Sequence, residues 1–389
     1  MQPVRQAVIL AAGASTRTHP LTVDRPKPLL PLLNRPLLAH TLTQLEGLVE
    51  EVILVVGFRH EMIRAAFGAR FGSLRLRYVE QREPVGTGHA LLQALPLLEG
   101  RFLVLNGDDL VARRDLEALM AWPQALLTTV MDDPRAFSIV ELDAEGRVVR
   151  IIEKPSDPPP GAQTSVGFYL MGPEAAEAVR AIRPSPRGEY ELTDVAAAMT
   201  AAHRFRAVPV RGYWLPIGYP WKLLEATRFL LDRDPPPIPV LPGVEVEGPV
   251  LLGEGVVVER GARIGPYTVL GDGVRIGAGA VVRESLLMAG VTVGARARIE
   301  ASVLAEDVWV GEEARFLPCE PPCTAPIRSR VKGRWVETGL RRLGAVIGAG
   351  ARVGRGATLY PGVKLWPRLR LPDGATLRDD LPANEEVMG

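Results

Sequence analysis

A six-residue repeat runs through the C-terminal part of the chain and limits the folds that this part can adopt. Large apolar residues recur in one phase, slip once, and resume. They are Val246, Leu252, Val258, Ile264, Leu270, Ile276 and Val282, then Leu287, Val293, Ile299, Val310 and Phe316, and finally Ile347, Val353, Leu359, Leu365 and Leu371. This period fits neither a helix nor a flat strand. It is typical of a hexapeptide parallel β-helix, in which each such residue points inward at a corner of a triangular coil. Glycine often follows the inward residue, which predicts turns that need positive φ.

A proline-rich stretch separates the repeat from a different N-terminal pattern. The sequence DRDPPPIPVLPG, residues 232–243, breaks both periodicities and predicts a linker. We therefore expect one domain at residues 1–231 and the coil at residues 244–389. An interruption of the repeat at residues 317–342 predicts a loop that projects from the coil. A chain of 389 residues is long enough for such a division.

Short apolar runs alternate with amphipathic stretches in the N-terminal part. AVIL, EVILVVG, RFLVLNGD and QALLTTV predict buried strands of a parallel sheet, and PLLAHTLTQLEGL, HEMIRAAFGARF and GTGHALLQALPLL predict helices. This order is typical of a Rossmann-like, doubly wound α/β domain with helices on both faces of the sheet. The segment FSIVELDAEGRVVRIIEKP alternates around residues 144–146, which predicts an inserted hairpin.

Charge and cysteine content narrow the function classes. The formal net charge is +1 without a block of like charges, which argues against a nucleic-acid surface. Because the sequence has no apolar run of about 18 residues and no signal-peptide pattern, we expect a soluble cytoplasmic protein without a membrane partner. Cys319 and Cys323 lack further ligands for a zinc site. We expect them to be structural, with a local disulfide as the alternative.

The segment LAAGASTRTHPLTVDRPKPLLPL follows the first strand, at the sheet edge where such folds bind ligands. It is neither a P-loop nor a dinucleotide-binding GxGxxG motif. Gly13 lets a ligand approach the backbone, successive amides can cradle an anion, and Arg17 and Lys27 supply positive charge. The segment therefore predicts an anion site, with a solvated turn as the plainer alternative.

Four further stretches, in order, join this segment in resembling the sugar-1-phosphate nucleotidylyltransferases over the first 230 residues. They are QREPVGTGHAL, VLNGDD, IIEKP and YWLPIGYPWKLLEA. The resemblance implies transfer of a nucleotidyl group, from UTP or dTTP in preference, to a sugar 1-phosphate. An oxygen of the sugar phosphate is already ionised at neutral pH, so the reaction needs positioning and charge stabilisation rather than a general base.

The resemblance also implies roles for individual residues. The nucleotide would be bound by Leu10, Ala11, Ala12, Gly13, Gln81, Gly86 and Thr87. Arg17 would contact the leaving pyrophosphate, Lys27 the α- and β-phosphates, and Asp108 would bind Mg²⁺. The sugar phosphate would be bound by Glu153, Lys154, Ser165 and Gly167. Gln81 carries both a donor and an acceptor for the edge of uracil or thymine. The plainer alternatives are a turn or helix cap for Asp108, a surface glutamine for Gln81 and a solvated pair for Glu153 and Lys154. We expect His89 to be a helix-start residue rather than a catalyst.

Three residues depart from the family pattern, whereas Glu189 matches it. Pro216 stands where a second metal carboxylate is common, Ser138 where many members have glycine, and Ser165 where many have asparagine. Mg²⁺ can still be held by one carboxylate together with phosphates and water. These departures keep open a second interpretation, in which the chain is a non-catalytic regulatory paralogue that binds a nucleotide-sugar and acts through its oligomer.

The coil resembles the left-handed β-helix of bifunctional members that also acetylate a hexosamine phosphate. Those acetyltransferases use a histidine as base. The histidines of this chain all precede the linker; they are His19, His40, His60, His89 and His203. We therefore expect the acetyltransferase activity to be absent, with an acyltransferase as a further alternative. We expect the coil to form a homotrimer through flat apolar faces.

Overall fold

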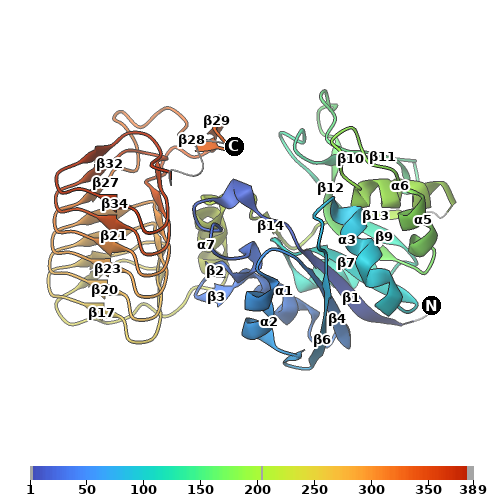
Figure 1. Cartoon of the computed structure of the whole chain (residues 1–389), viewed down its shortest axis with the longest axis horizontal. Coiled ribbons are helices and arrows are strands. Elements are labelled where there is room, and N and C mark those ends of the chain that lie inside the picture. Colours follow the sequence, from blue (N-terminus) through green and yellow to red (C-terminus); the bar gives the residue numbers. More distant parts are fainter. Residues whose placement is uncertain (1–2, 203–204, 383–389) are drawn as a thin grey trace. The chain divides into compact units, whose positions relative to one another are not determined.

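The computed structural model describes residues 3–202 and 205–382, with the side chains of residues 201 and 202 left aside; His203 lies outside the described residues. The chain divides into two compact units (Figure 1). The first holds residues up to 14, residues 26–29 and residues 37–216. The second holds residues 15–25, residues 30–36 and the chain from residue 217 onward. The segment after the first strand is therefore shared between the two units.

A mixed sheet forms the centre of the first unit. Its strands are β1 (Val4–Ala11), β4 (Glu51–Val56), β5 (Arg70–Phe71), β6 (Leu74–Glu80), β7 (Arg101–Asn106), β9 (Ala125–Val130), β10 (Ser138–Leu142), β11 (Val148–Ile152), β12 (Gln163–Met171) and β13 (Arg206–Pro209). Eight of them follow the order β11-β10-β12-β7-β1-β4-β6-β5, while β9 pairs with β12 and β13. A separate pair joins β8 (Asp109–Val111) to β14 (Trp214–Pro216).

Helices cover both faces of this sheet, as predicted. They are α1 (Leu37–Leu45), α2 (His60–Phe67), α3 (Thr87–Ala94), α4 (Arg113–Met120), α5 (Ala175–Ala181) and α6 (Leu192–Ala202). In β1, Ala7 and Ile9 face a core shared with α1, α2 and α4, whereas Val8 faces a core shared with α3, α5 and α6. Successive strand residues point to opposite faces, so an apolar run such as AVIL fills two cores at once.

The sheet is only partly parallel, which corrects one detail of the sequence prediction. Strands β1, β4, β6 and β7 run parallel, and the hairpin β10–β11 forms around residues 144–146 as predicted. The predicted strand QALLTTV is β9, but it pairs antiparallel with β12. The sequence analysis assigned neither β12 nor β6 to strands. Strand β12 pairs antiparallel with β7, β9 and β10, whereas β13 at the far edge pairs parallel with β9.

The second unit is built on a left-handed parallel β-helix whose short strands stack into three sheets. The first sheet contains β15 (Glu245–Val246), β18 (Arg263–Ile264), β21 (Val281–Arg283), β24 (Arg298–Glu300), β27 (Arg315–Phe316), β32 (Thr358–Leu359) and β35 (Thr376–Leu377). The second contains β16 (Val250–Leu252), β19 (Thr268–Leu270), β22 (Leu286–Leu287), β25 (Val303–Leu304), β30 (Val346–Ile347) and β33 (Lys364–Leu365). The third contains β17 (Val257–Val258), β20 (Arg275–Ile276), β23 (Thr292–Val293), β26 (Trp309–Val310), β31 (Arg352–Val353) and β34 (Arg370–Leu371).

The predicted apolar series lines the interior of the coil. Every residue of the series belongs to the coil core or packs against it. The structure adds Leu304, which is fully buried in the same core and which the sequence analysis passed over. The step from Ile299 to Leu304 is five residues, like the step from Val282 to Leu287, so the register slips twice rather than once.

Most glycines that follow an inward residue have a different role from the predicted one; Gly265, with φ 96°, has the predicted conformation. Gly277 and Gly294 do not have positive φ, but a Cβ at either would come within 2.6 Å and 2.5 Å of a backbone nitrogen in the next coil. Positive φ occurs two residues further on, for example at Gly279 and Arg296. The first glycine is therefore required by the close stacking of the coils, while the turn itself tolerates other residues.

A hairpin interrupts the coil between β27 and β30, inside the predicted loop. It consists of β28 (Arg328–Val331) and β29 (Arg334–Glu337), which pair antiparallel. Cys319 and Cys323 form a disulfide at the start of this segment. The disulfide was the alternative in the sequence analysis. It takes the place of the unpaired structural cysteines that we expected, because the turn between the two residues brings their Cα atoms to 5.3 Å.

One face of the coil is covered within the second unit by segments from earlier in the chain. Outward-facing residues of the second sheet, such as Val269 and Val303, are fully buried. Asn34, between β2 (Pro31–Leu32) and β3 (Arg35–Pro36), donates a hydrogen bond to the carbonyl of Leu270, and Arg25 forms an ion pair with Glu306. Helix α7 (Lys222–Arg233) belongs to the same unit.

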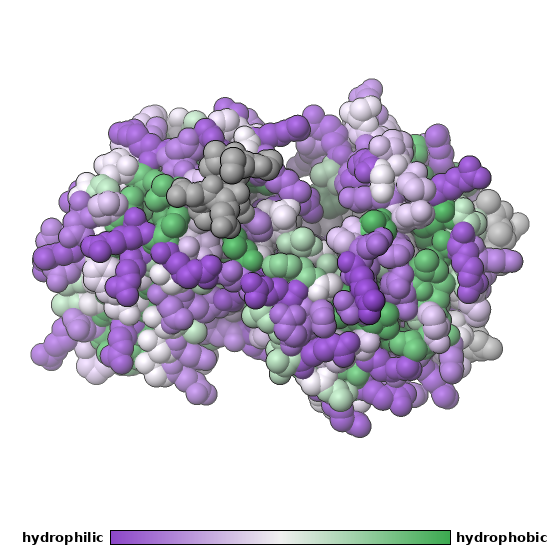
Figure 2. All heavy atoms as spheres, in the orientation of Figure 1, coloured by the Kyte–Doolittle hydropathy of each residue, from purple (hydrophilic) through white to green (hydrophobic). Residues whose placement is uncertain are grey.

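Hydrophilic residues dominate the face shown in Figure 2, with apolar residues in smaller groups between them. Within residues 3–202 and 205–382, we find no helix with the length and apolar character needed to cross a bilayer.

Candidate functional site

The carboxyl ends of three parallel strands meet at one edge of the first unit. Gly57 follows β4 and Gly107 follows β7, and both lie against the end of β1. A Cβ at Gly57 would come within 2.6 Å of the Ala12 carbonyl oxygen, and one at Gly107 within 2.7 Å of the Leu10 carbonyl oxygen. The Gly107 amide also donates to that Leu10 oxygen at 2.9 Å. These glycines let three strand ends come together at the place where parallel α/β sheets bind ligands.

Gly13 stands at this edge with open space around it. Leu10 and Ala11 end β1, and Ala11 and Ala12 are buried, whereas Gly13 is exposed. A Cβ at Gly13 would meet no described atom within 4 Å, and its φ is not in the left-handed region. Neither strain nor crowding within the described chain therefore requires glycine here. A glycine at this position leaves the backbone accessible to a ligand.

Lys27 reaches the same edge and pairs with Asp108. Lys27 begins a short 3₁₀ helix, and only 2% of its surface is exposed. Its Nζ donates to Oδ2 of Asp108 at 2.6 Å, and the Asp108 side chain is 38% exposed. An ammonium buried without an opposite charge is costly. Asp108 therefore holds the Lys27 charge in place at the end of β7 while keeping part of its own carboxylate open to solvent.

Asp109, the next residue, is buried and held by its neighbours. Its Oδ2 accepts hydrogen bonds from Trp214 Nε1 at 3.1 Å and from Asn106 Nδ2 at 3.4 Å. Burial, together with the charge of Asp108, raises the pKa of Asp109 to about 7. Pro216 lies opposite Asp109 in the pairing of β14 with β8. The side chain of Asp109 thus joins two strands, and the proline opposite it offers no side-chain ligand for a cation.

Arg17 belongs to the second unit and is exposed. Its guanidinium lies 5.7 Å from the centre of the Tyr219 ring, within the range of a cation–π contact. Nearby, Thr18 and Thr22 both donate to the carbonyl of Ser15, a residue in the left-handed region at φ 55°. The loop that carries Arg17 therefore has a hydrogen-bonded structure of its own.

The segment from Gln81 to Thr87 is fixed by hydrogen bonds at the start of α3. Gln81 is 4% exposed, and its Nε2 donates to the Gly86 carbonyl at 3.0 Å. Gly86 has φ 120°, and a Cβ there would come within 2.4 Å of the Tyr190 carbonyl oxygen. The hydroxyl of Thr87 accepts from the Leu192 amide at 2.9 Å. The loop before α6 therefore holds this segment in position.

Glu153 lies at the centre of a polar cluster. Its carboxylate accepts hydrogen bonds from Ser138 and, at 3.1 Å, from Thr193, and it lies 3.2 Å from both Lys154 Nζ and an Arg187 nitrogen. Burial acts to raise the pKa of Glu153, but the hydrogen bond from Ser138 and the charge of Lys154 outweigh it and lower the pKa below its usual value. The carboxylate is therefore ionised and already well supplied with donors.

Ser165 and Gly167 lie on β12, beside this cluster. Ser138 and Ser165 are directly paired between β10 and β12. The Ser165 hydroxyl lies 3.1 Å from the hydroxyl of buried Tyr169. A Cβ at Gly167, where φ is 80°, would come within 2.0 Å of Asn106 Nδ2. Gly167 thus leaves room for the asparagine that bonds to Asp109.

The structure brings in residues to which the sequence analysis gave no role in a site. Arg187 pairs with Glu153 and with buried Glu191, and His89 contacts Gln81. The segment GEYELTD, noted for Glu189, carried a signal for this loop; its Arg187 neighbour lies 3.8 Å from Glu189. Asn106 and Trp214 lie in the stretches VLNGDD and YWLPIGYPWKLLEA, but each acts through a hydrogen bond to Asp109 that forms only in the folded chain.

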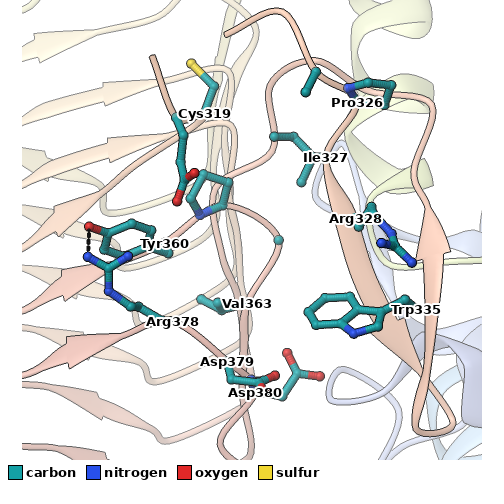
Figure 3. Close-up of a pocket in the computed structure, with 14 residues that line it drawn as sticks. Cys319, Pro326, Ile327, Arg328, Trp335, Tyr360, Val363, Arg378, Asp379 and Asp380 are labelled. Atoms are coloured by element: carbon teal, nitrogen blue, oxygen red, sulfur yellow. Dashed lines mark hydrogen bonds between the residues drawn. The ribbon is translucent and has the colours of Figure 1, made fainter. Parts of the chain in front are cut away.

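A cavity of about 380 Å³ lies in the second unit, between the inserted hairpin and the coil. In Figure 3, Trp335 faces it from the hairpin side, and Tyr360 and Arg378 lie on the coil side. Arg378 donates a hydrogen bond to the Tyr360 hydroxyl and lies 3.8 Å from the centre of its ring. The lining includes Asp379 and Asp380 but no histidine among the described residues.

A buried ion pair beside this cavity leads to a pH prediction. Lys364 is 2% exposed, and its Nζ lies 3.8 Å from Asp380. Burial raises the pKa of Asp380 to about 6, against the opposing charge of Lys364. A carboxyl group whose pKa is higher in the folded chain binds more protons when folded. The contribution of Asp380 to stability should therefore rise as the pH falls from about 6 to about 4.

Asp380→Asn should remove this gain on acidification. Melting temperatures are measured by calorimetry at about pH 4.5 and about pH 6.5 for both proteins. Relative to its value at pH 6.5, the melting temperature at pH 4.5 should be lower in Asp380→Asn than in the wild type. Asp379→Asn is the matched control, because Asp379 pairs with Arg330 at 2.9 Å and is half-exposed. An Asp380→Asn protein with the wild-type pH dependence would contradict the assignment.

Comparisons with known proteins cover both units. A family model described as nucleotidyl transferase matches residues 6–233, and a model described as the GMPPB C-terminal domain matches residues 246–319. The bifunctional protein GlmU of Methanococcus vannielii is 34% identical over 257 residues, which are 64% of this chain and 61% of that protein. This chain thus spans about three fifths of the length of that relative.

A second relative and a solved structure are also similar to this chain. A glucose-1-phosphate thymidylyltransferase of Streptomyces griseus is 36% identical over 243 residues, covering 59% of this chain and 67% of that protein. The crystal structure of a UDP-glucose pyrophosphorylase complexed with UDP-glucose has the same fold, with a TM-score of 0.54 and 20% identity over 59% of this chain and 99% of that chain. Because the family model matches more than half of its residues, the chain belongs to the nucleotidyl transferase family.

Proposed function

We propose that this chain transfers a nucleotidyl group from a nucleoside triphosphate, UTP or dTTP in preference, to a sugar 1-phosphate and releases pyrophosphate. The observation that carries the proposal is the pair formed by buried Lys27 and half-exposed Asp108 at the end of β7. A fixed positive charge beside an accessible carboxylate suits a triphosphate and its counter-cation. Open space around Gly13, at the end of β1 in the same sheet, supports the same function.

The donor set fits Mg²⁺ only together with a nucleotide. No group of three metal-ligating side chains occurs among residues 3–202 and 205–382. Asp109 is occupied by Trp214, and the Pro216 side chain has no ligand atom, so Asp108 is the carboxylate that would hold the ion. One carboxylate with substrate phosphates and water is a common magnesium environment. When bound, Mg²⁺ neutralises phosphate charge and holds the phosphate oxygens in place.

In the proposed reaction, an ionised oxygen of the sugar 1-phosphate attacks the α-phosphorus of the triphosphate. A new P–O bond forms, the bond between the α-phosphorus and the bridging oxygen breaks, and pyrophosphate leaves with the electron pair. Lys27 would stabilise charge on the α- and β-phosphates, and Arg17 charge on the pyrophosphate. Leu10 and Ala11, at the end of β1, would position the backbone of Ala12 and Gly13 against the phosphates. No residue is needed as a general base.

Gln81 is proposed to contact the base, and its removal gives a testable prediction. Gln81→Ala should lower the ratio of kcat/KM for UTP over CTP by about tenfold, the worth of one or two hydrogen bonds. The measurement is pyrophosphate release with each nucleotide at a fixed sugar phosphate. Gln44→Ala, on α1, is the control, because this glutamine contacts the Arg113 amide and has no proposed role in the site. An unchanged ratio in Gln81→Ala would remove Gln81 from the base site.

Glu153, Lys154, Ser165 and Gly167 are proposed to form the sugar-phosphate side of the site. Lys154 can pair with the phosphate, while Glu153 can accept hydrogen bonds from sugar hydroxyls. The Glu153 cluster is already supplied by Ser138, Thr193 and Arg187. Few acceptor positions on Glu153 are therefore left for sugar hydroxyls. A sugar with a hydroxyl that reaches one of these positions should be preferred over a sugar without one.

A substrate screen tests the proposal. Pyrophosphate release is measured for UTP, dTTP, GTP, CTP and ATP against the 1-phosphates of glucose, N-acetylglucosamine, galactose and mannose, with magnesium present. We expect robust turnover with UTP or dTTP and at least one sugar. Nucleotide-sugar binding without turnover on any pair would favour the second candidate, a regulatory paralogue, for which Pro216 opposite Asp109 is the specific observation.

For the second unit we propose assembly rather than acetyl transfer. The support is that no histidine follows the linker, and that Val257 and Trp309 are exposed apolar side chains on one sheet of the coil. We propose a homotrimer, with the domain boundaries 1–231 and 244–389 joined by residues 232–243. Analytical ultracentrifugation should give three times the chain mass of 42.2 kDa. A monomer, or acetylation of an amino sugar phosphate by acetyl-CoA, would contradict this part.

A further inference from the structure

The side chain of His89 lies against the proposed base-contacting residue Gln81. Gln81 Nε2 lies 3.0 Å from the Gly86 carbonyl oxygen and 3.0 Å from Nδ1 of His89. A carbonyl oxygen can only accept, so the Gln81 atom facing it must be the amide nitrogen. The orientation of the Gln81 amide is therefore determined by its partners, and His89 Nδ1 must act as an acceptor.

The tautomer of His89 follows from this arrangement. A neutral imidazole that accepts at Nδ1 carries its proton on Nε2. That nitrogen lies 3.1 Å from the terminal amide of Gln93, one turn along α3. A half-turn of the Gln93 amide brings its oxygen to the ring N–H at 3.1 Å and gives up only the long contact of its nitrogen with the His89 carbonyl at 3.5 Å. Gln93 thus completes a chain of contacts that holds the imidazole in the form Gln81 requires.

The Gln81 side-chain oxygen is then an acceptor of this segment that is left without a partner among the described residues. The Gly86 carbonyl accepts from Gln81 and from the Ala90 amide at 3.1 Å. The Thr87 hydroxyl accepts from Leu192. Gln81 Oε1 has no hydrogen-bond partner within residues 3–202 and 205–382, although the side chain as a whole is buried, and it is not among the fully buried unpartnered atoms.

We propose that His89 is a positioning residue that sets base selectivity by holding the Gln81 amide with its oxygen toward the nucleobase; this rests on the proposed function. An oxygen in that place accepts the N3–H of uracil or thymine. Cytosine presents an unprotonated N3 lone pair at the same position, so it meets the Gln81 oxygen with repulsion. If the amide turned over, its NH₂ would suit cytosine instead. His89 and Gly86 together oppose that turn.

Two substitutions at His89 separate this role from a purely structural one. His89→Leu removes the acceptor that faces Gln81. His89→Asn places an oxygen where Nδ1 stood and loses the Gln93 contact, as leucine does. The two variants therefore differ at the acceptor alone. The readouts are Kd for UTP and CTP by calorimetry, and kcat/KM for both nucleotides wherever the protein turns over.

We expect His89→Leu to lower the UTP-over-CTP ratio by about tenfold, partly through tighter binding of CTP, with His89→Asn within about twofold of the wild type. The inference is overturned if His89→Leu keeps the wild-type ratio, or if His89→Asn loses as much as His89→Leu. It is also overturned if UTP weakens without any gain for CTP. The absence of turnover in the wild type would contradict the proposed function, while the binding ratios would still decide the role of His89.

Discussion

Lys27→Met is expected to lower kcat by about two to three orders of magnitude, the usual cost of losing one fixed donor to a charged transition state. Methionine has nearly the length of lysine and suits the buried position, so the substitution removes the charge without opening a cavity. Asp108, which is 38% exposed, can be solvated after its partner is lost. The measurement is pyrophosphate release at saturating nucleotide and sugar phosphate.

The control for Lys27→Met is Lys222→Met. Lys222 also forms an ion pair, with Glu225 at 2.8 Å on α7, but it has no proposed role in the reaction. It should keep wild-type turnover. If Lys27→Met kept turnover within a few-fold of the wild type while remaining folded by circular dichroism, Lys27 would not act on the phosphates, and the pair with Asp108 would be structural.

Asp108→Asn is expected to lower turnover about 100-fold or more and to raise the magnesium concentration needed for half-maximal activity. An amide keeps an oxygen for the hydrogen bond from Lys27 but lacks the negative charge that attracts the cation. Because Pro216 cannot act as a second ligand, the loss at Asp108 should be larger than in a site with two carboxylates. Activity is titrated against free Mg²⁺ for both proteins.

The control for Asp108→Asn is Asp234→Asn, which removes a carboxylate paired with Arg233 just after α7. We expect its magnesium curve to match the wild type. Full activity in Asp108→Asn with an unchanged magnesium requirement would show that the metal assignment is wrong, whatever the outcome at Lys27.

The coil was the most predictable part of the molecule. Its interior positions follow from a single period, since each inward residue occupies an equivalent corner. The sequence analysis missed Leu304 because the chain takes a five-residue step there. It also misread Gly277 and Gly294, because the close approach of the neighbouring coil involves residues distant in the chain and leaves no mark in the local pattern.

The sheet of the first unit was predictable in most of its strands but not in all of their pairings. Continuous apolar runs identify β1, β4 and β7, which are buried on both faces. The analysis did not identify β6, although its arginines alternate with apolar residues as in a strand with one exposed face, and it did not assign β12, although that strand carries the hairpin. The disulfide between Cys319 and Cys323 depended on the shape of a turn, which spacing alone does not specify.

Parts of the candidate site were visible in the sequence and others were not. Glycine and charge after β1 and β7 mark the sheet edge, and the structure places Lys27 against Asp108 there. The hydrogen bonds from Trp214 to Asp109, from Arg187 to Glu153 and from Gln81 to His89 connect residues whose relation depends on tertiary packing. Such contacts decide which atoms remain available to a ligand, and a linear pattern cannot supply them.

A crystal structure with UTP and Mg²⁺ tests the central claim most directly. We expect the phosphates to lie against the Gly13 amide and Lys27, with the metal ion beside Asp108 and the base facing Gln81. A nucleotide bound elsewhere, or a Lys27–Asp108 pair left without phosphate or metal at saturating concentrations, would contradict the account.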